Sequence, residues 1–130
     1  MSTETILGNH RALTLDVLNY LDQGISVFDE DLRLLAWNRR LFDLLQLPEA
    51  FAQPGLSIEV IFRFNAERGE YGEGHIDEIV AERMRLARTF APHVFDRVRP
   101  DGTVIEVRGN PLPNNSGFVT TYTDVTQQRM

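Results

Sequence analysis

Hydrophobic residues recur with the period of an α-helix in several parts of the chain. In residues 9–22 they form an apolar stripe along one side of a predicted helix, made of Leu13, Val17, Tyr20 and Leu21. Leu15 and Leu18 form a second apolar patch, so this helix has more apolar surface than one contact can cover. Gly24 follows it, as glycine often does after the last turn of a helix.

Three further helices are predicted in the middle of the chain. The first covers residues 39–47 and is stopped by Pro48, the second runs from about residue 57 to residue 68, and the third spans residues 75–90. The third has the clearest period, with one apolar face made of Ile76, Ile79, Val80, Met84 and Ala87.

The period changes to that of β-strands before these helices. Residues 25–29 and 32–38 form a predicted hairpin with a two-residue loop, Glu30-Asp31. In this register one face holds Phe28, Leu35 and Trp37, and the other holds Ile25, Val27, Leu34 and Ala36. Because both faces are partly apolar, we expect the N-terminal helix to cover one of them.

A second hairpin is predicted after the helices, where Asp101-Gly102 separates two strand-like runs. A two-residue loop pairs Arg97 with Glu106 and keeps charged and apolar side chains on separate faces. A three-residue loop breaks that separation, so we predict the two-residue register, which places Asp96 on the apolar face. With a last strand over residues 118–124, the order of elements predicts an α+β fold with a five-stranded antiparallel sheet.

Composition excludes several classes of function. The chain has 130 residues, no cysteine, no lysine and a formal net charge of -6. Without cysteine and lysine there are no disulfides, thiolate metal ligands, Schiff bases or P-loop. The negative charge disfavours nucleic-acid binding, and no stretch approaches the ~20 apolar residues of a membrane span. We therefore expect a cytoplasmic domain that contacts neither nucleic acid nor membrane.

Five short motifs follow one another over about residues 18–127. They are Gly24-Ile25-Ser26-Val27-Phe28-Asp29, Ala36-Trp37-Asn38, Gly69-Glu70-Tyr71-Gly72, Val107-Arg108-Gly109-Asn110-Pro111-Leu112-Pro113 and Gly117-Phe118-Val119-Thr120-Thr121-Tyr122-Thr123-Asp124. In this order they resemble the PAS family, and most closely a subgroup found on bacterial sensor histidine kinases and related signalling proteins. The Asp124-Val125-Thr126 ending is similar to the family's C-terminal signature.

The resemblance implies a sensory or regulatory module rather than an enzyme. PAS domains have helices on one face of a five-stranded sheet, around a pocket, and a flanking helix that often builds a homodimer. We expect residues 1–23 to be that flanking dimerisation helix, residues 24–126 the PAS domain, and residues 127–130 the start of a linker to an output domain, a histidine kinase. In the family the positions of Asp124 and Thr126 transfer the signal, and Thr126 suits the N-cap of a linker helix.

Five side chains are candidates for lining the pocket: Trp37, Phe42, Phe62, Met84 and Asp96. The aromatic ones could equally fill the core. A carboxylate on the inner face, as predicted for Asp96, must be paired or carry a raised pKa. Alternatively, a β-bulge turns Asp96 outward, or it pairs with an arginine such as Arg63 or Arg108.

The resemblance also limits the cofactors. LOV-type flavin photosensors need a cysteine directly after an asparagine, where this chain has Asn38-Arg39-Arg40, so a covalent flavin adduct is excluded. A haem-binding PAS domain places an axial histidine on the long helix, which begins at His75, although that position also suits a surface or capping residue. We expect no cofactor and no metal, and leave open noncovalent flavin binding and an unidentified small molecule. Arginine is the only cation available to an anionic ligand.

Two other functions stay open. Eight phenylalanines and three tyrosines could fill the core completely, which would make the chain a ligand-free dimerisation or protein-interaction module. A small α+β enzyme could use Asp96, but the sequence shows no converging base, nucleophile and orienting group.

Overall fold

The computed structural model describes residues 22–129, and it has the predicted α+β class. Five strands form one antiparallel sheet in the order β2-β1-β5-β4-β3. The strands are β1 (Gly24–Asp29), β2 (Leu34–Trp37), β3 (His93–Val98), β4 (Val104–Pro111) and β5 (Gly117–Asp124). The predicted N-terminal helix, with Leu13, Val17, Tyr20 and Leu21, lies outside the described residues except for its last position.

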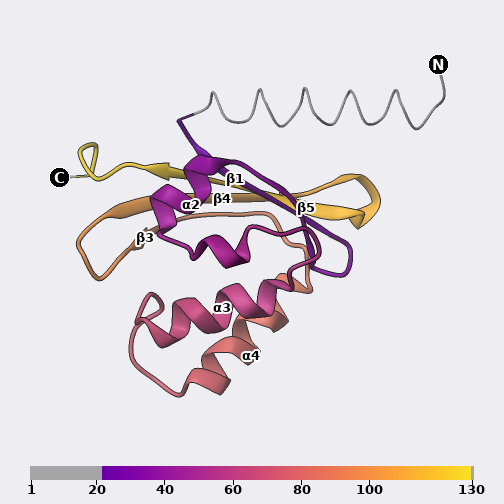
Figure 1. Cartoon of the computed structure of the whole chain (residues 1–130), viewed down its shortest axis with the longest axis horizontal. Coiled ribbons are helices and arrows are strands. Elements are labelled where there is room, and N and C mark those ends of the chain that lie inside the picture. Colours follow the sequence, from indigo (N-terminus) through magenta and orange to yellow (C-terminus); the bar gives the residue numbers. More distant parts are fainter. Residues whose placement is uncertain (1–21, 130) are drawn as a thin grey trace.

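Three α-helices connect β2 to β3, as the periodicity predicts. They are α2 (Arg39–Leu45), α3 (Ile58–Glu67) and α4 (Ile76–Ala87), and single 3-10 turns occur at η1 (Glu49–Phe51) and η2 (Pro113–Asn115). Asn38 and Ser57 cap α2 and α3 by accepting hydrogen bonds from Leu41 N and Glu59 N. In Figure 1, α3 and α4 lie together on one side of the sheet.

The register of the first hairpin differs from the prediction. Ser26 pairs with Trp37 and Phe28 pairs with Leu34, with a register shift between them. The loop is longer than two residues, because Asp29 Oδ1 accepts hydrogen bonds from Asp31 N and Arg33 N. In the observed register four side chains lie on the inner face of the sheet: Ser26, Phe28, Leu34 and Trp37. The two-residue register would place Leu34 on the opposite face from the other three.

The register of the second hairpin is also different, by one residue, and here the consequence is larger. Arg97 pairs with Ile105 and Asp96 with Glu106, because the loop has three residues. Pro100 and Asp101 occupy the centre of a turn closed by a hydrogen bond from Gly102 N to Arg99 O, and Gly102 has φ 91°. Arg97 therefore faces the inside of the domain, and Asp96 faces outward.

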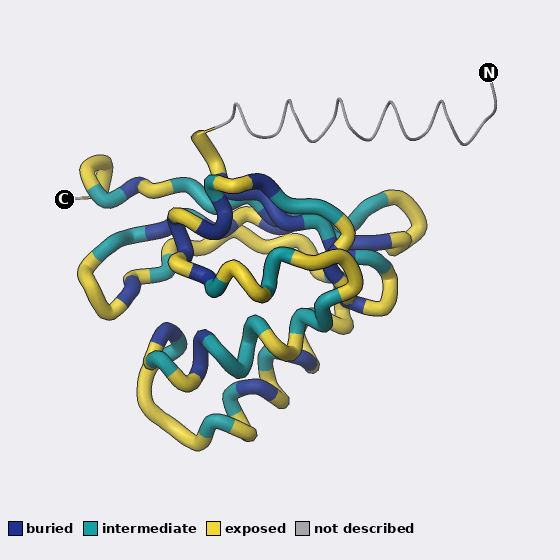
Figure 2. Tube along the Cα trace, viewed as in Figure 1, coloured by how far each residue is buried: buried dark blue, intermediate teal, exposed yellow. Residues whose placement is uncertain are grey.

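The core consists of several hydrophobic clusters, and Figure 2 shows buried positions on the strands and on the helices. One packs α3 against α4 through Ala66, Val80 and Met84. Another surrounds α2 and contains Leu41, Phe42, Leu45 and Leu47. Because α3 and α4 pack mainly on each other, a space remains between these two helices and the sheet.

Candidate functional site

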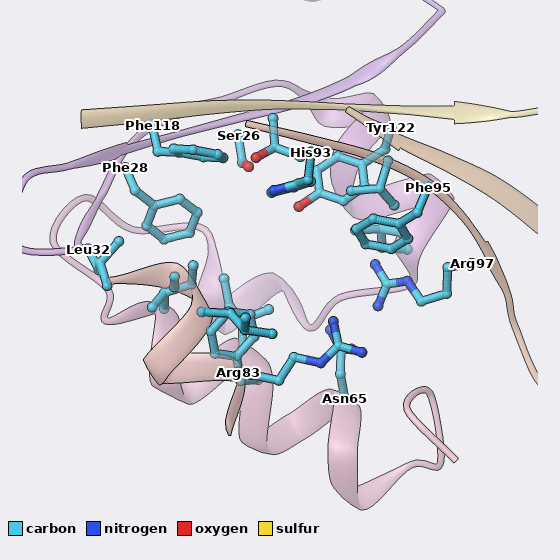
Figure 3. A pocket seen from close by; sticks show the side chains of 18 of the residues that line it. Ser26, Phe28, Leu32, Asn65, Arg83, His93, Phe95, Arg97, Phe118 and Tyr122 are labelled. Carbon is cyan, nitrogen blue, oxygen red and sulfur yellow. The ribbon is translucent and has the colours of Figure 1, made fainter. Parts of the chain in front are cut away.

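A cavity of about 380 Å³ lies between the inner face of the sheet and the helices. This volume falls within the range of small-molecule sites. Figure 3 shows Phe28, Leu32 and Phe118 at one end of the cavity and Arg97 at the other. Its apolar lining comes from every layer of the domain and includes Phe28, Leu32, Leu41, Leu45, Leu47, Ile58, Ile61, Phe62, Leu86, Phe90, Phe95, Val107 and Phe118.

Stacked rings form the sheet side of the cavity. His93 stacks on Phe118 with ring centroids 5.4 Å apart and contacts Phe95 at 5.5 Å. Both His93 and Phe118 lie over Gly109, where a Cβ atom would come within 2.5 Å of each ring. Glycine at position 109 therefore leaves the room in which these two rings lie. His93 lies on the edge strand β3, pairs with Gly109 of β4 and lines the cavity.

Two arginines reach the cavity from opposite layers. The guanidinium carbon of Arg83, on α4, lies 3.9 Å from the centroid of the Tyr71 ring, and that of Arg97, on β3, lies 5.5 Å from it. Figure 3 shows the two side chains converging beside Asn65. Burial lowers the pKa of Arg83, and the neighbouring charge of Arg97 lowers it further, although arginine stays charged at neutral pH.

Several hydroxyl groups add to the polar part of the lining, among them those of Ser26 and Tyr122. Ser26 Oγ is buried and lies beside the Tyr122 phenol. Burial raises the pKa of Tyr122, and the positive charge of Arg97 offsets only part of this rise. The phenol is therefore neutral at physiological pH. The cavity thus offers neutral hydroxyls and two cations, and none of its lining residues carries a carboxylate.

The turn after α3 holds the hairpin of β3 and β4 in place. Glu70 in this turn accepts hydrogen bonds from Arg99, with Oε1 2.9 Å from Nη2, and both side chains are buried. Arg99 also donates to Leu44 O and to Gln46 Oε1, at the C-terminal end of α2. Glu70 and Tyr71 belong to one of the motifs identified in the sequence, but the two-residue hairpin register hid their connection to Arg99 and Arg97.

The five predicted pocket residues lie in different places. Phe62 lines the cavity. Trp37 and Phe42 pack on each other in the cluster around α2, and Met84 is buried between α3 and α4, so none of these three is part of the lining. Asp96 is exposed on the outer face, because the three-residue loop shifts the register, and its Oδ2 accepts a hydrogen bond from Arg129 Nε at 2.8 Å.

The last strand ends in a small hydrogen-bonded unit. Asp124 Oδ1 accepts hydrogen bonds from Thr126 N and Thr126 Oγ1, and Thr126 Oγ1 in turn accepts from Val104 N. These bonds lower the pKa of Asp124 because they favour its charged form. The Thr126 hydroxyl is thus used within the sheet rather than as the predicted N-cap, and residues 126–129 form turns.

The remaining candidates from the sequence concern haem, metal ions and membranes. His75 is exposed at the N-cap of α4 and does not line the cavity. Within residues 22–129 no group of His, Asp and Glu side chains is placed to hold a metal ion. Likewise, none of the helices described there has the length and apolar character needed to cross a membrane.

A family model described as the PAS fold matches residues 18–130, nearly the whole chain. The chain belongs to the PAS family. A cavity between the sheet and the helices of this PAS domain lies where the resemblance of its motifs implies a pocket. No curated protein has a sequence that matches this PAS domain.

Several solved PAS structures share the fold. The PAS domain of BvgS from Bordetella pertussis is 15% identical, with a TM-score of 0.61, over 89% of this chain and 86% of the other. A domain of a sensory box sensor histidine kinase/response regulator from Geobacter sulfurreducens is 14% identical, with a TM-score of 0.53, over 95% and 100%. The PAS domain of the quorum-sensing receptor RpfR from Cronobacter turicensis, in complex with C12:0, is 15% identical, with a TM-score of 0.51, over 81% and 95%.

Proposed function

We propose that this PAS domain is a sensor that binds a small molecule in the cavity and transfers the signal through β5 to an output domain. The observation that carries the proposal is the cavity itself, about 380 Å³ in volume and lined by side chains from the sheet and from all three α-helices. A ligand in this space would touch every layer of the domain. It could therefore change the relative stability of two packings of the helices on the sheet.

The position of β5 supports the proposed direction of signal transfer. Three of its residues line the cavity, namely Phe118, Thr120 and Tyr122. Two residues beyond Tyr122 the strand ends at Asp124, which is bonded to Thr126. A ligand that displaces Tyr122 would act on the same strand that continues into residues 127–130, the proposed start of the linker.

The wider setting follows from the same proposal. Residues 24–126 would form the PAS domain of a cytoplasmic bacterial histidine kinase, as the likeness to PAS domains of sensor kinases suggests. Residues 1–23 would form the flanking helix of a homodimer. The expected partners are a second copy of the chain and a small molecule. We expect no prosthetic group and no contact with nucleic acid or membrane.

Native mass spectrometry of the purified chain tests whether the cavity holds a ligand. We expect a fraction of the protein to carry a noncovalent adduct that is lost on denaturation. Ala87→Leu, which adds volume to a residue of the cavity lining, should remove the adduct. Ala81→Leu, at an exposed position of the same helix, should retain it.

A ligand-free dimerisation module is the second candidate. It is favoured by apolar side chains on the outer face of the sheet, where Val94 and Val98 are 57% and 66% exposed. If native mass spectrometry shows only bare polypeptide for the wild type and for both leucine variants, and the protein forms a stable dimer, the sensor proposal is overturned in favour of this module.

A further inference from the structure

Arg83 and Arg97 are cations at an apolar cavity, and neither forms an ion pair with a carboxylate of the described residues. The carboxylate next to Tyr71 in the sequence, Glu70, is already bonded to Arg99 and paired with Arg68. Nε of Arg97 is buried and has no hydrogen-bond partner. Both side chains are half-buried, and withdrawing a charged group from water without a counter-charge is unfavourable, so an anion at this end of the cavity would be stabilising.

The two cations are also placed to act together. Both lie against the ring of Tyr71, so they are neighbours although they come from α4 and β3. Two like charges held close together repel each other, and an anion between them would convert that repulsion into attraction. Guanidinium groups donate paired hydrogen bonds to carboxylate and other compact oxyanions, which lysine cannot do as well.

The other end of the cavity has the opposite character. Phe28 and Phe118 lie there, away from Arg97 (Figure 3), and Phe90 packs on Phe118 with ring centroids 6.1 Å apart. Apart from the buried Ser26 hydroxyl and the His93 ring on the sheet, this end offers apolar surface, which favours an apolar group over water. A small inorganic anion would leave this surface without a partner.

We propose that the cavity binds an amphipathic anion, with a compact oxyanion such as a carboxylate between Arg83 and Arg97 and an apolar body among Phe28, Phe62 and Phe118. This inference rests on the proposed function, since it names the class of ligand for the same cavity. The oxyanion supplies the missing counter-charge, and the apolar body fills the space between the sheet and the helices.

Calorimetric titration with octanoate, decanoate and dodecanoate, each compared with the alcohol of the same chain length, tests this ligand class. We expect at least one carboxylate to bind saturably and at least about tenfold more tightly than its alcohol, because charge-assisted hydrogen bonds contribute that much or more. Arg83→Gln and Arg97→Gln should each weaken carboxylate binding by about tenfold and change alcohol binding by less than about twofold.

Two matched arginine variants and the thermal stability of the free protein serve as controls. Arg85→Gln lies on the exposed side of α4 and Arg108→Gln on the outer face of β4, and both should bind the carboxylate as the wild type does. Without ligand, Arg83→Gln and Arg97→Gln should melt no lower than the wild type, because each removes an unpaired cation. A purely structural role on Tyr71 predicts the reverse, a lower melting temperature and an equal loss of both probes.

The outcomes separate this inference from the proposed function. Equal affinity for carboxylates and alcohols, unaffected by either cavity variant, would leave the cavity as a binding site and overturn the anionic class. Absence of saturable carboxylate binding would overturn the inference as well. In both cases the sensor proposal depends on its own test, the adduct seen by mass spectrometry and its loss in Ala87→Leu.

Discussion

Arg97 and Arg99 are two residues apart and point to the same side of the sheet, yet their surroundings differ. Arg99 is buried and binds Glu70, whereas Arg97 lies over the ring of Tyr71, the next residue of the same turn. The buried ion pair therefore helps to hold β3 at the distance from α3 that places Arg97 beside the cavity. Arginine suits both positions because its planar fork can bond several acceptors and also stack on a ring.

Replacing Glu70 by alanine should destabilise the domain strongly. The substitution removes the buried carboxylate that binds Arg99 and, among the described residues, leaves only the exposed Asp101 carboxylate, 3.8 Å from Nη1. Removal of one partner of a buried pair typically costs about 3–5 kcal/mol. Urea unfolding of the whole chain measures this loss. Glu82→Ala breaks the exposed pair with Arg85 on α4 and should change the free energy of unfolding far less than Glu70→Ala does, because water screens an exposed pair. Similar losses for the two variants would show that Arg99 finds other partners.

At the scale of elements, the hairpin between β3 and β4 decides which side chains reach the cavity. The sequence predicts both strands and the turn between them. The segregation of charges on the two faces does not distinguish a two-residue loop from a three-residue loop, because Arg97 and Arg99 are charged and yet lie on the inner face. Pro100 was the better signal, since proline at the second position of a turn and glycine at the fourth favour the three-residue loop that is found.

The end of β5 gives a prediction about pH. Hydrogen bonds from Thr126 hold the pKa of Asp124 below its value in the unfolded chain, which is about 3.9. A carboxylate with a lowered pKa stabilises the folded state above the unfolded value, and this contribution is lost as the pH falls through the folded value. The difference in unfolding free energy between wild type and Asp124→Asn should therefore be present at neutral pH and shrink below about pH 4.

Asp43→Asn, at an exposed position of α2, is the matched control for the substitution. A difference for Asp124→Asn that stays constant from neutral pH to the acidic range would contradict the role given to the Thr126 hydrogen bonds. Urea unfolding at a series of pH values gives both curves.

At the scale of the whole molecule, the outer face of the sheet and the predicted N-terminal helix raise the question of assembly. The sequence predicts that the stripe of Leu13 and Val17 forms a homodimer interface. Leu13→Glu with Val17→Glu should therefore give monomers in sedimentation velocity, because buried like charges would oppose association. Asn19→Glu, which lies off the stripe, should leave the dimer intact. A dimer that persists in the double variant would place the interface elsewhere.

The sequence by itself determined the class of fold, the order of helices and strands, and the family. These follow from local periodicity, from Gly, Pro and Asn at the ends of elements, and from five motifs in order. Only the tertiary structure decided which residues line the cavity. A shift of one residue in a hairpin reverses the faces of a strand, so Asp96 lies outside, where Arg129 binds it, and Arg97 lies inside.

The absence of lysine shows the same division between sequence and structure. From the sequence it follows that arginine must serve any anionic ligand, but not which of the 13 arginines does so. Arg83 and Arg97 are 14 positions apart, on a helix and on a strand that pack on opposite sides of the cavity. Their meeting at Tyr71 depends on long-range packing, which no local pattern encodes.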